Sequence, residues 1–141
     1  MGIATQRGAL LLDAVAAIAV FAIGSLGCIT LQAHAIRHVH AGHCRSEAAH
    51  LVQALVGRMR AEDPAALAAR YDARTGGAGY TAFSRLALRL PGADNPGNAP
   101  ELRVEQGPAP GSRRVTVGVH WQLPGEPVAH RHGATVVIGG N

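Results

Sequence analysis

Proline is absent from residues 1–63 of this 141-residue chain, and all eight prolines lie at or after Pro64. Proline breaks helix interiors because it lacks a backbone N–H and its ring collides with the preceding turn. Its absence permits one continuous helix, which we predict from about Leu10 to Ala61. Such a helix is roughly 75–80 Å long at 1.5 Å per residue.

Charge is absent from the run Ala14–Leu31, and Asp13 stands at the start of that run. An apolar segment of this length suits a membrane-spanning helix. An isolated aspartate costs about 2.5–3.5 kcal/mol at the middle of a bilayer and less near its edge. An ordinary membrane anchor has no use for such an acid, so we expect Asp13 to have a compensating partner.

Lysine is also absent, and aromatic residues make up only 4% of the chain. The basic residues are all arginines, and they are scattered, with only Arg113 and Arg114 adjacent. Nucleic-acid binding needs a clustered basic surface, and single strands add aromatic stacking platforms. We therefore do not expect nucleic acid as the primary partner.

Cysteine is scarce, and Cys28 and Cys44 are the only two. On one continuous helix they lie about 24 Å apart. A disulfide needs Cα atoms within about 7 Å, so the two cannot pair within the chain. We expect Cys28 to be a small residue facing lipid or another helix. Cys44 is expected to be a buried thiol, with a cross-link between subunits as the alternative.

The second half of the predicted helix is amphipathic. Apolar residues recur there at intervals of three to four, as on one face of a helix: Cys44, Ala48, Leu51, Val52, Leu55 and Met59. This stripe predicts a helix that packs against a sheet.

Two short helices are predicted to follow. Asp63 is a good N-cap and Pro64 a good first helical residue, so the first helix should run from Pro64 to Tyr71. The second comes after a glycine-rich break and ends at the start of the loop Pro91–Pro100. Its apolar face consists of Phe83, Leu86, Ala87 and Leu90.

The remainder of the chain predicts three strands. Alternation of apolar and polar residues is clearest from Arg114 to Leu123, with further strands at Glu101–Gln106 and Ala134–Ile138. Short connections favour consecutive antiparallel neighbours. The predicted fold class is α+β, with Trp121 in the contact between sheet and half-helix. His130-Arg131-His132 is predicted to be a solvated loop.

The residues before Asp13 complete a known motif. Arg7-Gly8-Ala9-Leu10-Leu11-Leu12-Asp13 resembles the N-terminus of type IV pilins and of the pseudopilins of type II secretion. The resemblance implies that prepilin peptidase cleaves after Gly8, that Ala9 becomes a methylated N-terminus, and that Asp13 is the acidic fifth residue of the mature chain. In that family the acid pairs with the N-terminal amine of a neighbouring subunit. Ala9 replaces the usual Phe or Met, and Asp13 replaces the usual Glu.

Two further stretches are similar to the minor pilins of the PilV type, the type IV pilus modification proteins. They are Leu51–Ala61, which ends in Arg58-Met59-Arg60-Ala61, and the strand element Val119-His120-Trp121. This similarity implies a pilin-like fold, in which a long helix, half of it transmembrane, packs on a small antiparallel sheet. It also implies a non-catalytic minor subunit that acts in pilus assembly or initiation.

The implied organisation is a prepilin leader at 1–8, a transmembrane and assembly half-helix at 9–35, and a periplasmic head at 36–141. The head contains the amphipathic half-helix 36–61, the short helices within 64–90 and the sheet 101–138. The implied partners are prepilin peptidase, other minor and major pilins, and the inner membrane, with later placement in the pilus fibre or at its tip.

Other interpretations of the N-terminus remain open. Ala33-His34-Ala35 fits the cleavage site of a secretory signal peptide, and the apolar run also fits a plain single-pass anchor. The chain would then be a periplasmic binding module that never polymerises. A minor pseudopilin of type II secretion is a further alternative.

We expect neither catalysis nor a metal. The histidines within residues 34–50 include the i, i+4 pairs His34 with His38 and His40 with Cys44. One straight helix offers only two ligands on one face, whereas zinc needs three or four. The sequence contains no ordered nucleophile and base, and its glycine runs do not form a phosphate loop. We therefore predict a non-enzymatic protein without a cofactor.

Overall fold

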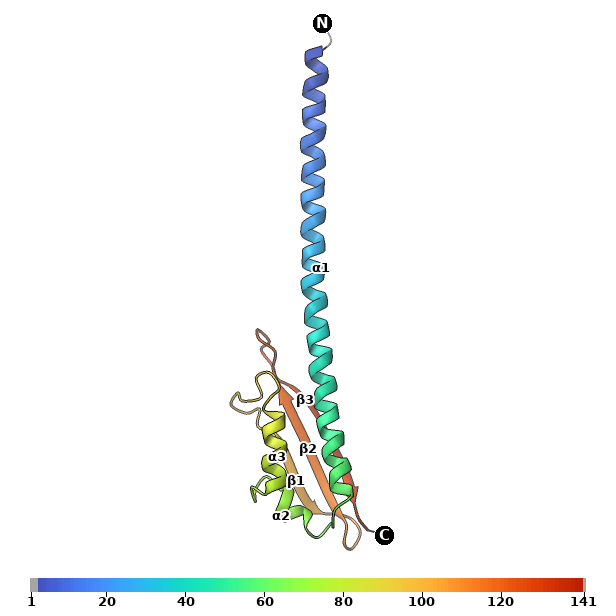
Figure 1. The fold of residues 1–141 in the computed structure, drawn as a ribbon, viewed down its shortest axis with the longest axis vertical. Helices are drawn as coiled ribbons and strands as arrows, with labels where there is room; N and C mark the ends of the chain where they lie inside the picture. The colour runs from blue at the N-terminus through green and yellow to red at the C-terminus, as the bar shows by residue number, and fades with distance from the viewer. Residues whose placement is uncertain (1–2, 141) are drawn as a thin grey trace. The chain divides into compact units, whose positions relative to one another are not determined.

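The computed structural model describes the backbone of residues 3–140 and, within that range, all side chains except those of residues 3–10, 33, 34 and 37. The chain divides into two compact units, Met1–His40 and Ala41–Asn141. The element order (Figure 1) is α1 (Ile3–Arg60), α2 (Leu67–Tyr71), α3 (Ala78–Ala87), β1 (Glu101–Gln106), β2 (Arg113–Trp121) and β3 (His130–Ile138).

The long N-terminal helix is confirmed. α1 is a single helix of 58 residues, with Arg58 and Arg60 in its last turn. Cations there suit the negative end of the helix macrodipole. The helix ends three residues before Pro64, which agrees with the limit that proline sets.

The sheet is antiparallel with strand order β1-β2-β3, so the predicted α+β class and its consecutive strand topology are confirmed. In the register, Leu102 lies opposite Val117, and Val117 lies opposite Ala134. The odd-numbered residues of β2 from Val115 to Trp121 are buried, whereas Arg114 on the other face is exposed. One face of the sheet is therefore covered, and the other faces solvent.

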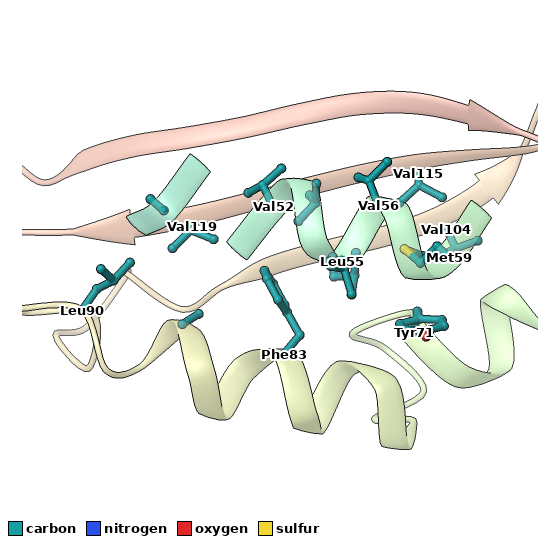
Figure 2. Close-up of a cluster of buried hydrophobic side chains, with 14 of the residues drawn as sticks. Val52, Leu55, Val56, Met59, Tyr71, Phe83, Leu90, Val104, Val115 and Val119 are labelled. Carbon is teal, nitrogen blue, oxygen red and sulfur yellow. The ribbon is translucent and has the colours of Figure 1, made fainter. Parts of the chain in front are cut away.

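The head core lies on the covered face. The predicted stripe of α1 is buried in it, with Ala48 and Met59 at 0% exposure, and Trp121 of β2 is buried as expected. Leu51 flanks the stripe and is only partly buried. Figure 2 shows side chains from three helices and the sheet meeting in this core: Val52, Leu55, Val56, Met59, Tyr71, Phe83, Leu90, Val104, Val115 and Val119.

The two short helices are both shorter than predicted. Residues 64–66 form a turn instead of helix, because the N–H groups of Ala66 and Leu67 bond to carbonyls three residues back. Asp63 caps that turn, where its carboxylate accepts the Ala65 N–H at 3.0 Å. α2 therefore begins only at Leu67.

The apolar face of the second short helix is also corrected. α3 ends at Ala87 and not at Pro91, and Leu90 is buried from the turn that follows. Leu86 is 43% exposed, whereas Phe83 and Ala87 are buried as predicted. Three of the four residues thus face the core, and Leu86 borders a groove between α1 and α3.

The prediction of a solvated loop at His130-Arg131-His132 is wrong. These residues begin β3, and His130 lies opposite Trp121 in the register. The His130 ring stacks on the Trp121 ring at 5.5 Å between centroids, and its Nε2 lies 2.8 Å from Glu126 Oε2. Pairing with β2 and this stack outweigh the weak strand preference of the segment itself.

Candidate functional site

The segment Leu11–Gln32 of α1 is long and apolar enough to span a membrane, and none of its length is buried within the chain. Large apolar side chains are exposed all around it: Leu11, Leu12, Val15, Ile18, Val20, Phe21, Ile23, Leu26, Ile29 and Leu31. Burying one such side chain is worth about 1.5–3 kcal/mol. A helix with this surface needs a covering of lipid or of other apolar helices.

Asp13 lies near the start of this segment and is exposed. The ion pairs of the described residues include none that involves Asp13. Ala16 and Ala17, three and four positions further along the helix, lie on the same face and are small. A neighbouring chain can therefore approach the carboxylate without displacing a large side chain.

The proposed cleavage and methylation residues fall partly outside the described residues. Gly8 and Ala9 lie within the printed bounds of α1, but their side-chain surroundings are not described. Along the helix, Ala9 is one turn before Asp13, about 6 Å at standard rise. Cleavage after Gly8 would place a new amine at this distance from the carboxylate of the same chain.

The small residues of the apolar segment have no packing role within the chain. A Cβ added at Gly24 or Gly27 would meet nothing within 4 Å. Each glycine costs a helix up to about 1 kcal/mol relative to alanine, so the chain's own contacts do not account for them. Small residues on a membrane helix allow a second helix to approach closely.

Polar groups in the segment are satisfied locally. The Thr30 hydroxyl lies 2.8 Å from the Gly27 carbonyl and 3.0 Å from the Leu26 carbonyl, so it donates back into its own helix. Such a hydroxyl can sit in an apolar medium without an external partner. Asp13 is therefore the one residue among Leu11–Gln32 with a formal charge to compensate.

The histidine-rich part of α1 does not form a metal site in the described part of the chain. No group of three or more His, Cys, Asp or Glu residues is close enough to hold an ion there. His43 Nδ1 lies 3.8 Å from Glu47 Oε2, with both side chains exposed. The side chain of His34 lies outside the described residues, and His38 and His40 are exposed.

The cysteines have different surroundings. Both are free thiols, Cys28 exposed in the apolar segment and Cys44 buried in the head core. The expectation that Cys44 is a buried thiol is confirmed. Burial is the main cause that raises the pKa of the Cys44 thiol, and the charge of Glu47 adds to it.

Sequence reasoning missed the most elaborate polar site of the head, which surrounds Asp72. This carboxylate is 2% exposed and accepts hydrogen bonds from the backbone N–H groups of Arg74 and Val104 at 2.8 and 2.9 Å. The Arg74 guanidinium donates two more at 2.9 Å each. The Arg74 hydrogen bond is the largest cause that holds the pKa of Asp72 far below its ordinary value.

The only local signal for this site was Asp72 directly after a helix, with Arg74 two residues later. The decisive contact is with Val104, which is 32 residues away in the sequence. The site ties the segment after α2 to strand β1, so it stabilises the fold and has no reactive group facing a cleft.

No family model, curated protein or solved structure matches this chain. What the chain does is therefore inferred from its residues and their geometry.

Proposed function

We propose that this chain is a pilin-like structural subunit, a minor pilin of the PilV type that takes part in type IV pilus assembly or initiation. Its apolar helix would anchor it in the inner membrane, with the head in the periplasm, before it enters the pilus fibre or tip. The observation that carries the proposal is Asp13: a lone acid five residues beyond Gly8, at the start of a fully exposed apolar helix.

Cleavage by a prepilin peptidase after Gly8 would supply the missing counter-charge. It creates an amine at Ala9, and the amine of a neighbouring subunit can then pair with Asp13 as the helix leaves the lipid. Two unit charges 4 Å apart attract by about 4 kcal/mol at an effective dielectric of 20. Desolvation cancels much of this attraction, so the pair contributes more to registry than to affinity.

Registry follows because a misplaced neighbour leaves a buried charge without a partner. Breaking such a pair costs about 3–5 kcal/mol. The exposed apolar side chains supply the non-specific attraction between helices, and Gly24 and Gly27 permit close approach. Asp13 would then select one axial position among the many that apolar packing alone allows.

The residues that resemble the PilV type lie in the head. Met59, Val119 and Trp121 are buried in the core, whereas Arg58 and Arg60 are exposed. This placement supports a role for the three buried residues in shaping the head. The exposed arginines remain available for contacts with other subunits.

Mass spectrometry of the mature N-terminus in native cells tests the proposal. A chain that begins at Ala9, with or without a methyl group, is the expected result. A chain that begins at Ile36 would indicate a secreted protein, and one that begins at Met1 or Gly2 a plain anchor. Either of these results overturns the proposal.

A second experiment tests assembly itself. Asp13→Ala should leave cleavage intact but lower the recovery of the protein in sheared pili, with Asp13→Glu as the control that keeps the charge. Normal recovery of Asp13→Ala would contradict the proposed role. Recovery only with a secretion apparatus, and not with pili, would assign the chain to the pseudopilins.

A further inference from the structure

The two edges of the sheet use their backbone groups differently. At the β1 edge, the Val104 N–H donates to Asp72 Oδ2 and the Leu102 carbonyl accepts the Ala73 N–H, each at 2.9 Å. The segment after α2 therefore covers this edge. At β3, no backbone hydrogen bond beyond the ladder with β2 occurs among the described residues.

The same contacts show which groups of β3 face outward. In an antiparallel ladder, each residue directs both its N–H and its C=O to one side. Leu102 directs its carbonyl away from β2, so its partner Val117 bonds toward β3, where it lies opposite Ala134. The even-numbered residues of β3 are thus bonded to β2. The odd-numbered ones point their backbone groups to the free edge: Arg131, Gly133, Thr135 and Val137.

This edge lacks the usual protections. Natural sheets block an exposed edge with proline, lysine, a bulge or a covering segment. The nine residues of β3 include neither proline nor lysine, and the four outward-directed residues are all exposed. A regular edge of this kind is a template for an added strand, with main-chain hydrogen bonds supplying affinity and alternate side chains supplying specificity.

The side chains of β3 define the chemistry of its partner. The strand begins with three basic residues, His130-Arg131-His132, contains no carboxylate and ends with exposed Val137. Opposite charges or β-branched pairs across strands contribute about 0.2–1 kcal/mol each, and like charges are unfavourable. A second β3 in parallel alignment would oppose Arg131 to Arg131.

We propose that β3 docks an extended segment of another polypeptide as an antiparallel fourth strand. That segment carries acidic residues opposite Arg131 and β-branched apolar residues opposite Val137. The proposal requires neither a filament nor cleavage after Gly8, so it is independent of the proposed function.

Fluorescence anisotropy with the full chain in detergent micelles tests it. The probe is a labelled peptide of nine residues, with Val and Thr alternating in its first part and two Glu near its C-terminus. Its isomer has Lys in place of both Glu. The Glu peptide should bind at least about tenfold more tightly than the Lys peptide. Equal binding of the two peptides, or no saturable binding of the Glu peptide, overturns the proposal.

Thr135→Pro removes one outward N–H and leaves the ladder with β2 intact, since proline is tolerated where a strand N–H faces solvent. It should weaken binding of the Glu peptide by about tenfold or more. The matched variant Thr135→Val keeps the N–H and should bind within about twofold of the parent. Undiminished binding to Thr135→Pro overturns the proposal.

Two measurements keep the result interpretable. Arg131→Glu leaves the backbone unchanged and should reverse the preference, so that the Lys peptide binds more tightly; an unchanged preference counts against the proposal. Light scattering without peptide tests the second copy as occupant. Self-association that Thr135→Pro abolishes would assign the edge to another copy of this chain and overturn the acidic partner.

Discussion

The two units of the chain treat apolar side chains in opposite ways. In residues 11–32 every large apolar side chain is exposed, whereas in residues 41–140 the apolar stripe of α1 is buried under a sheet. The same helix thus passes from a surface that must be covered by other molecules to one that the chain covers itself. Stability of the head and assembly of the N-terminal segment are therefore separable properties, and paired substitutions can test this.

The largest contrast should come from core truncation. Met59→Ala removes a side chain with 0% exposure and should lower the free energy of unfolding of the head by about 2–5 kcal/mol. Ile23→Ala, on the exposed segment, should change it by less than about 0.5 kcal/mol. Urea unfolding in micelles, followed by Trp121 fluorescence, measures both. Equal losses would mean that the two regions are not independent.

The buried carboxylate should give the next largest effect. Asp72→Ala leaves the Val104 N–H without its acceptor and should destabilise the head by about 1–3 kcal/mol. Asp94→Ala, at an exposed loop position, is the matched control and should stay within about 0.5 kcal/mol. A similar loss for both variants in the same assay would show that the Asp72 contacts do not stabilise the head.

Acid should remove the contribution of Asp72. Its pKa is depressed below the ordinary value of 3.8, chiefly by the Arg74 hydrogen bond. A depressed carboxyl pKa gives stability that is fully present above the unfolded pKa and is lost as the pH falls toward the folded pKa. The difference in unfolding free energy between parent and Asp72→Ala should be constant from about pH 5 to 8 and shrink below about pH 4. A constant difference down to about pH 2 would contradict this linkage.

A smaller effect is expected at Tyr71, whose ring is buried and whose hydroxyl donates to Glu62 Oε1 at 2.7 Å. Tyr71→Phe keeps the ring and should cost about 0.5–1.5 kcal/mol. Glu62→Gln retains an acceptor and should cost less than Tyr71→Phe. The reverse order in urea unfolding would show that the charge of Glu62, which also lies 3.4 Å from Arg70, matters more than the hydrogen bond.

The smallest effect on the head should come from Gly27→Ala. It adds a methyl group in open space and improves helix preference by up to about 1 kcal/mol, without touching the head. Unfolding of the head should therefore be unchanged. Recovery in sheared pili should fall if a second helix packs against Gly27, and unchanged recovery would indicate that this glycine faces lipid.

The sequence predicted those features that depend on local periodicity. The absence of proline and the three-to-four-residue spacing from Cys44 to Met59 located α1 and its buried face, and alternation located β1 and most of β2. Features that depend on distant pairing were missed. His130–His132 form a strand because β2 pairs with them, and Asp72 is buried because Val104 lies beside it. Asp13 was found because an acid beside an apolar run is conspicuous in sequence alone.

The two thiols provide an internal reporter of where the N-terminal segment resides. Cys28 is exposed on the apolar segment, whereas Cys44 is shielded by the head. A water-soluble maleimide reacts with thiolates, which form readily in water and hardly at all in hydrocarbon. Labelling of Cys28 therefore distinguishes lipid or packed helices from aqueous exposure, while Cys44 becomes reactive only when the head unfolds.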